Sequence, residues 1–127
     1  MLRGPLIARL VAAGRIVFGL ALMLAPERVT TPWLGSDARR PGSRVVSRGL
    51  GARDLGLGAG ALAAPDSQLV PWVAAAIVAD AADLVATVAA GDSLPRSGRI
   101  LVGAVASAGA ALGLFALASL QRHPPSD

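Results

Sequence analysis

Residues 44–64, RVVSRGLGARDLGLGAGALAA, decide how this chain folds. As a helix the stretch would be about 31 Å long, enough to cross a bilayer. It consists mostly of Gly, Ala, Leu and Val, yet it contains Arg48, Arg53 and Asp54. Charged side chains in the middle of a membrane span are costly and normally pair inside a helix bundle. The rest of the chain is therefore expected to supply helices that pack around this segment.

The composition favours a membrane protein. The chain has 127 residues, of which 54% are hydrophobic and only 16% charged, and its mean hydropathy is +0.59. A soluble core of this size cannot bury that much apolar surface, whereas lipid can. The absence of Cys excludes disulfides, thiol nucleophiles and Cys metal sites. The single His, His123, lies in a polar tail, so we expect no metal and no cofactor.

Apolar segments separated by Pro- and Gly-containing turns predict four helices, over 5–25, 44–64, 69–90 and 98–120. The expected fold is all-α: a four-helix transmembrane bundle in a single integral membrane domain, with a polar loop over 26–43 and a disordered tail over 121–127. An alternative treats the start of the chain as a secretory signal, with Arg3, Arg9 and Arg15 before an apolar core at 16–25. Met23 and Pro26 make a poor cleavage site there.

Ionisable residues of three predicted spans fall at one depth: Arg15, Arg53, Asp54, Asp80 and Asp83. We expect Arg15 to pair with Asp80 or Asp54, and Arg53 to pair with Asp80 or Asp83. Thr87 shares the face of Asp80 and Asp83 at helical spacing, which adds it to this intramembrane polar network.

The network has several possible roles. One is a salt-bridge network that fixes how the helices pack, as in a non-enzymatic accessory or structural subunit. Another is a small proton-coupled or anion transporter that uses Asp54, Asp80 and Asp83 with Arg15 and Arg53. A metal site on the three carboxylates is possible in ligand type, but the Arg residues would compete for the oxygens. We assign no catalytic residues, because the sequence does not match the membrane phosphotransferase motif and contains no Gly-x-Ser-x-Gly nucleophile elbow.

The sequence also predicts which positions pack helices together, which lie at the membrane interface and which face lipid. Close helix packing is expected at Gly49, Gly51, Gly56, Gly58, Gly60, Gly103, Ser107, Gly109 and Gly113. Trp33, Trp72 and Arg48 are expected at the membrane interface. The outward, lipid-facing positions are predicted to be Leu6, Leu10, Val17, Leu24, Val70, Val78, Val85 and Val88.

The net charge of +4 comes with Arg as the basic residue throughout. No basic groove with interleaved aromatic residues is visible, which argues against nucleic-acid binding. The Arg residues instead cluster in short loops, as in the positive-inside rule, and place loops 26–43 and 91–97 in the cytoplasm of a multi-pass plasma-membrane protein. The expected partners are the lipid bilayer and a second copy or a membrane complex, docking on segment 98–120, which carries no charge after Arg99.

Three short patterns carry a resemblance: Gly14-Arg15 with Gly19 and Ala25-Pro26, then Arg48-x-x-Gly51-x-Arg53-Asp54-x-x-x-Gly58, then Asp80-x-x-Asp83. Over residues 4–120 the chain resembles a family of small four-helix actinobacterial integral membrane proteins of unknown function. More remotely it is similar to DoxX-like membrane proteins. That second resemblance implies a subunit of a redox or membrane complex, although no quinone or haem ligand set matches.

Overall fold

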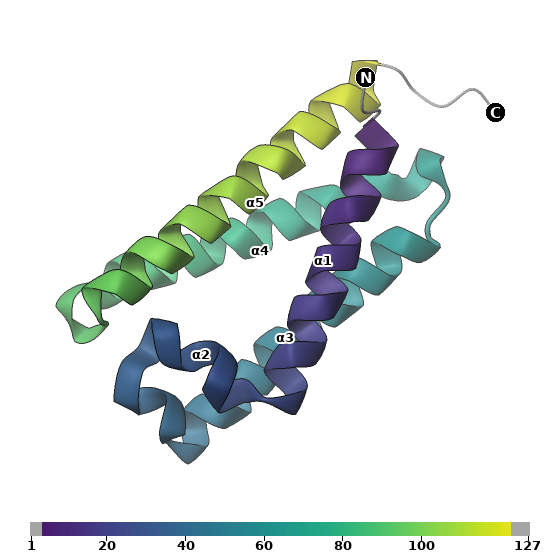
Figure 1. Ribbon diagram of the computed structural model, residues 1–127. Coiled ribbons are helices and arrows are strands. Elements are labelled where there is room, and N and C mark those ends of the chain that lie inside the picture. Colours follow the sequence, from purple (N-terminus) through teal and green to yellow (C-terminus); the bar gives the residue numbers. More distant parts are fainter. Residues whose placement is uncertain (1–3, 123–127) are drawn as a thin grey trace.

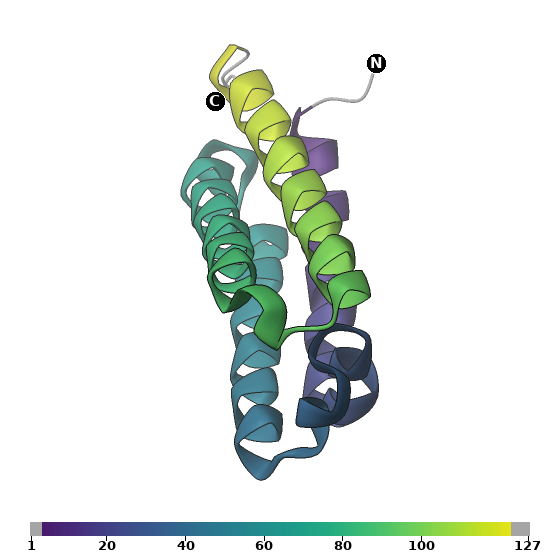
Figure 2. The ribbon, with the colours of Figure 1, turned by 90° about the vertical axis from the view of Figure 1, so that its left-hand side faces the viewer.

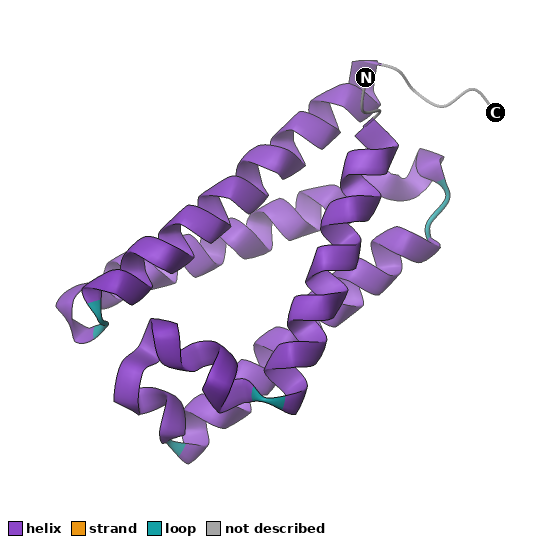
Figure 3. Cartoon of the chain, in the orientation of Figure 1, coloured by secondary structure: helices purple, strands orange, loops and turns teal. Residues whose placement is uncertain are grey.

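The computed structural model describes residues 4–122, and this part of the chain is helical with no strand (Figures 1 and 3). It has five α-helices rather than the four predicted, joined by three short 3₁₀ turns. In chain order the elements are α1 (Gly4–Leu24), α2 (Pro26–Leu34), η1 (Gly35–Arg39), α3 (Pro41–Ala63), η2 (Asp66–Gln68), α4 (Leu69–Ala90), η3 (Gly91–Ser93) and α5 (Arg96–Arg122).

The four long helices form two pairs, with α1 packed on α3 and α4 packed on α5. The described ends of the chain meet at one end of the molecule, where a β-carbon added to Gly4 would lie 2.8 Å from that of Ser119. The short helix α2 occupies the opposite end (Figure 2). Gly35 and Gly91 end α2 and α4 with positive φ angles of 61° and 52°, a conformation that glycine adopts without strain.

Helices α1 and α3 touch backbone to backbone. A β-carbon added to Gly51 would lie 2.6 Å from the carbonyl oxygen of Gly19, and one added to Gly58 would lie 2.5 Å from that of Ala12. Gly51 and Gly58 are two helical turns apart, so both face α1. Small residues at such positions allow the close approach that drives helix association in lipid. This explains why so many glycines are tolerated in α3.

The other predicted packing positions divide into two groups. Gly60 lies against the ring of Trp72, while Gly109 and Gly113 face Asp80 and Ile77 of α4. The prediction is wrong within this chain for four positions, because no other helix approaches them closely. A β-carbon added to Gly49 or Gly56 would meet no atom within 4 Å, Ser107 is exposed, and Gly103 meets only the tip of Leu84; the four are Gly49, Gly56, Gly103 and Ser107.

Most of the predicted polar loop over 26–43 is helical. Pro26 and Pro41 begin α2 and α3, because proline lacks the amide hydrogen that a first helical residue does not need. Helix α2 then folds under the start of α5, where a β-carbon added to Gly98 would lie 2.5 Å from the carbonyl oxygen of Pro32. Tertiary contact therefore stabilises a segment that looks like a loop in sequence. At the other end, Gln121 and Arg122 continue α5, and 123–127 lie outside the described residues.

Large apolar side chains cover much of the surface, while the interior combines a small apolar core with the buried carboxylate of Asp54. Val17, Val78, Val85 and Val88 are each more than two-thirds exposed, and Leu24 is 81% exposed, as predicted for lipid-facing positions. Leu6 and Leu10 are exposed too, whereas Val70 packs against the core and is a correction to the prediction. Three segments are long and apolar enough to cross a membrane: Gly4–Leu24, Asp66–Ser93 and Arg96–Arg122. The chain is therefore suited to a lipid environment.

Candidate functional site

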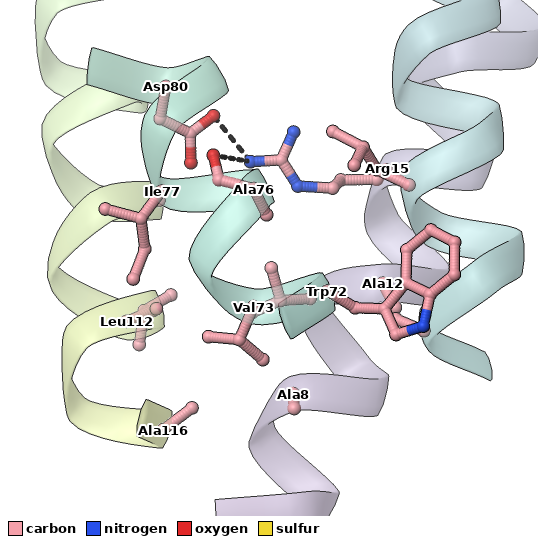
Figure 4. A pocket seen from close by; sticks show the side chains of 15 residues that line it. Ala8, Ala12, Arg15, Trp72, Val73, Ala76, Ile77, Asp80, Leu112 and Ala116 are labelled. Carbon is pink, nitrogen blue, oxygen red and sulfur yellow. Dashed lines mark hydrogen bonds and ion pairs between the residues drawn. The ribbon is translucent and has the colours of Figure 1, made fainter. Parts of the chain in front are cut away.

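Arg15 of α1 joins three helices. Its Nη1 donates to Oδ1 of Asp54 in α3 at 2.9 Å, and its Nη2 lies 2.6 Å from Oδ1 of Asp80 in α4. The same Nη2 donates to the backbone oxygen of Ala76 at 3.2 Å (Figure 4). The side chains of Arg15 and Asp54 are 10% and 6% exposed. Both predicted partners of Arg15 are thus confirmed at once.

Arg53 of α3 makes the second arm of the cluster. Its Nη1 and Nη2 donate to the two carboxylate oxygens of Asp83 at 2.9 and 2.7 Å, which is the strong bidentate geometry. Its Nη2 also lies 3.3 Å from Oδ1 of Asp54, so Asp54 connects the two Arg residues. Of the two predicted partners of Arg53, Asp83 is confirmed and Asp80 is wrong, because Asp80 points to Arg15.

Thr87 does not join the ion pairs. Its hydroxyl donates to the backbone oxygen of Asp83, one turn earlier in α4, at 2.7 Å, and its side chain is buried. A threonine in a helix commonly satisfies its hydroxyl in this way. Its place in the predicted network is corrected to a neighbouring position without a charged partner.

The cluster carries more carboxylates than guanidinium groups, and one of its donors, Nε of Arg15, is buried without a hydrogen-bond partner among the described residues. Two guanidinium groups face three carboxylates, so one carboxylate remains uncompensated when all five groups are ionised. Within residues 4–122, Oδ2 of Asp54 and Oδ2 of Asp80 accept no hydrogen bond. Arg53 and Asp83 are partly accessible, at 30% and 26% exposure. The open side of the cluster is therefore rich in carboxylate oxygen.

A cavity of about 360 Å³ lies on that open side and is lined by all five α-helices. Its remaining walls are mostly apolar. Val11 and Leu22 come from α1, Leu50 from α3, and Val102 and Ala106 from α5. Helices α1 and α5 separate toward the end that α2 closes (Figure 1), and Thr30 and Trp33 of α2 line the cavity there.

A second hollow of about 20 Å³ lies on the other side of the cluster (Figure 4). Arg15 and Asp80 border it, and Ala8, Val73 and Ala116 fill much of its lining. This volume holds about one water molecule. The cluster is consequently sealed on one face by tight packing and open on the other to the larger cavity.

Two Arg residues donate hydrogen bonds to backbone oxygens near helix ends. Arg9 donates to the backbone oxygens of Leu62 and Ala64 at 2.9 and 3.0 Å and pairs with Asp66 at 2.6 Å, which caps the end of α3. Arg48, predicted as an interface anchor, donates to the backbone oxygen of Met23 at 3.2 Å near the end of α1. Cations at helix C-termini complement the helix dipole.

The two tryptophans predicted at the membrane interface both have neighbours within the bundle. Trp72 covers Gly60 and borders the small hollow, so it packs within the bundle. Trp33 lines the large cavity, and its buried indole Nε1 finds no hydrogen-bond acceptor among the described residues. The cavity itself was missed, because no local sequence signal shows which apolar faces stay apart.

The described residues contain no group of three His, Cys, Asp or Glu side chains arranged to hold a metal ion. Fold and site together define a class: a helical protein with at least three candidate membrane spans and a buried Arg/Asp cluster. Comparisons with protein-family models, curated proteins and solved structures find no match to the chain. The resemblance to DoxX-like proteins therefore remains an expectation, and function rests on the geometry.

Proposed function

We propose that the chain is a non-enzymatic four-span membrane protein in which the Arg/Asp cluster locks α1, α3 and α4 together. The single observation that carries the proposal is that each of these helices contributes an ionisable side chain to one buried set of opposite charges. Helix α3 is less apolar than the other three long helices because of Arg44, Arg48, Arg53 and Asp54. The ion pairs that Arg53 and Asp54 make with α1 and α4 lower the cost of placing α3 in lipid.

The proposed orientation follows from the Arg residues at the two ends of the bundle. The end that carries α2 and η3 holds Arg28, Arg39, Arg40, Arg44, Arg96 and Arg99. The described part of the opposite end holds Arg9 and Arg122. The positive-inside rule places the end with α2 in the cytoplasm. The protein would then act as an accessory subunit in the plasma membrane, alone or with copies of itself.

A charge exchange tests the lock. Arg53→Asp should destabilise the protein in detergent, because it places a third carboxylate beside Asp54 and Asp83. Adding Asp83→Arg restores an opposite pair across the same contact and should recover at least half of the lost stability, measured by circular dichroism during titration with dodecyl sulfate. Arg53→Asp with Asp37→Arg is the control, since Asp37 is half exposed and pairs with Arg40 rather than with Arg53. Equal stability of both double variants would refute the lock.

The large cavity favours a second candidate, a small carrier. The cavity ends at Asp80 and Asp83, so a proton or a small solute inside it would meet the cluster directly. Gly14→Cys places a thiol on the cavity wall, and Ala13→Cys places one on the exposed face beside it. The chain has no other Cys. Faster reaction of Gly14→Cys than Ala13→Cys with a water-soluble maleimide in vesicles supports a hydrated path; protection of both excludes it.

A further inference from the structure

Asp80 lines both the large cavity and the small hollow, and its Oδ2 lies beside Gly109, which lines both as well. Arg15 holds its Oδ1 at 2.6 Å, while its Oδ2 accepts no hydrogen bond from the residues that the structure describes. A β-carbon added to Gly109 would lie 2.6 Å from this Oδ2. The glycine therefore leaves α5 without a side chain at the point where one would cover the oxygen. The partly accessible carboxylate of Asp83 lines the same cavity.

The rim of the cavity opens sideways between α1 and α5. Phe18, Leu101 and Val105 line the cavity and are 48%, 49% and 62% exposed. These residues belong to the apolar outer faces of two helices that are long enough to span a membrane. The end near α2 is covered by Trp33 and Thr30. A ligand would therefore enter from the lipid and must carry an apolar body.

The net charge of the cluster determines whether such a ligand should be a cation or an anion. Both Arg residues are paired with carboxylates, and of their donors only Nε of Arg15 is buried without a partner among the described residues. An anion would add to the excess negative charge of three carboxylates facing two guanidinium groups. A cation, in contrast, neutralises the excess carboxylate charge and donates hydrogen bonds to the carboxylate oxygens that accept none. Charge-assisted hydrogen bonds of this kind are about twice as strong as neutral ones.

We propose that the cavity binds an amphiphilic cation, with an ammonium group at Asp80 and Asp83 and an apolar chain along the walls toward Phe18 and Val105. The volume of about 360 Å³ lies within the range of small-molecule sites, about 300–1,000 Å³. Apolar walls with a few convergent polar groups are also typical of such sites. The inference rests on the proposed four-span arrangement, because the rim faces lipid only when α1 and α5 cross the bilayer.

Ligand binding can be followed by Trp fluorescence, because the chain has two Trp and no Tyr. Trp72→Phe leaves Trp33, on the cavity wall, as the sole fluorophore, and Trp33→Phe leaves Trp72, outside it. Both variants would be inserted into phosphatidylcholine vesicles and titrated with octylammonium, octanol and octyl sulfate. We expect saturable quenching or a spectral shift of Trp33 with octylammonium, at concentrations about tenfold or more below those for octanol and octyl sulfate. Trp72 should not respond.

Two further variants make the test specific. In the Trp72→Phe protein, which keeps Trp33, Asp80→Asn should weaken octylammonium binding about tenfold, equivalent to about 1.4 kcal/mol. Val105→Phe should weaken binding by narrowing the rim, whereas Val85→Phe, at an equally exposed position of α4 away from the cavity, should leave it unchanged. If Asp80→Asn loses its helical circular dichroism, the proposal is tested instead by comparing octylammonium binding to Val105→Phe and to Val85→Phe.

Equal affinities for the three amphiphiles, an equal response of Trp72, or unchanged binding by Val105→Phe would each overturn the cation site. These results would leave the structural lock intact, because the protein in the vesicles remains folded. Failure of the Arg53 and Asp83 charge exchange would instead overturn the lock without deciding ligand binding. The two proposals therefore fail in separate measurements.

Discussion

Replacement of Arg15 by methionine is the sharpest test of the buried cluster. Methionine keeps much of the length of the side chain and removes the charge and every donor. The change leaves Asp80 without its guanidinium and leaves Asp54 with only the longer contact to Arg53 at 3.3 Å, and both carboxylates are 13% exposed or less. Removal of one partner from a buried ion pair costs about 3–5 kcal/mol, because the remaining charge stays buried and unpaired. We expect Arg15→Met to lower the free energy of unfolding by an amount in this range.

The expected cost depends on burial, so an exposed pair supplies the matched control. Arg40 pairs with Asp37 at 3.0 Å, but the two side chains are 76% and 51% exposed. Pairs in that setting contribute about 0–1 kcal/mol. Arg40→Met should therefore shift the unfolding midpoint only slightly. A further variant, Arg15→Met with Asp80→Asn, should be more stable than Arg15→Met alone, since it removes the charge of Asp80 that Arg15→Met leaves without a partner.

The assay is unfolding in mixed micelles by titration with dodecyl sulfate, followed by far-ultraviolet circular dichroism. Midpoints and slopes give the free energy of unfolding for each variant. Equal midpoints for Arg15→Met and Arg40→Met would refute the claim that the cluster stabilises the helix arrangement. A double variant less stable than Arg15→Met would refute the explanation by stranded charge.

Further predictions concern packing, orientation and a helix end. Gly58→Ala should destabilise the protein by about 1–3 kcal/mol in the same assay, because its β-carbon would meet backbone of α1; Gly56→Ala, in open space, should stabilise it by up to about 1 kcal/mol. Ser36→Cys should react with an impermeant maleimide only from the cytoplasmic side and Ser67→Cys only from the other, and labelling of both from one side would contradict the four-span arrangement. Arg9→Met should speed hydrogen exchange at the last turn of α3 while leaving its centre protected, and unchanged exchange there would exclude a capping role.

The opposite charges of Arg15, Arg53, Asp54, Asp80 and Asp83 were enough to predict a common cluster. The reason is physical: a charge at the centre of an apolar helix must find a partner, and few partners are available at that depth. The outward faces of α1 and α4 were predictable for a similar reason, since helical spacing separates large apolar side chains from small and charged ones. The positions of the four long helices and the apolar exterior thus follow from local pattern and from the lipid environment that the composition favours.

The tertiary structure alone decided which partners meet and where space remains. Asp83 rather than Asp80 binds Arg53, because the rotation of α4 about its axis is set by packing along its whole length. Helix α2 forms because Gly98 lets it approach α5, a contact between residues far apart in the chain. The cavity exists because α1 and α5 separate where α2 intervenes. Separations between helices depend on the sum of many contacts, and no stretch of sequence encodes that sum by itself.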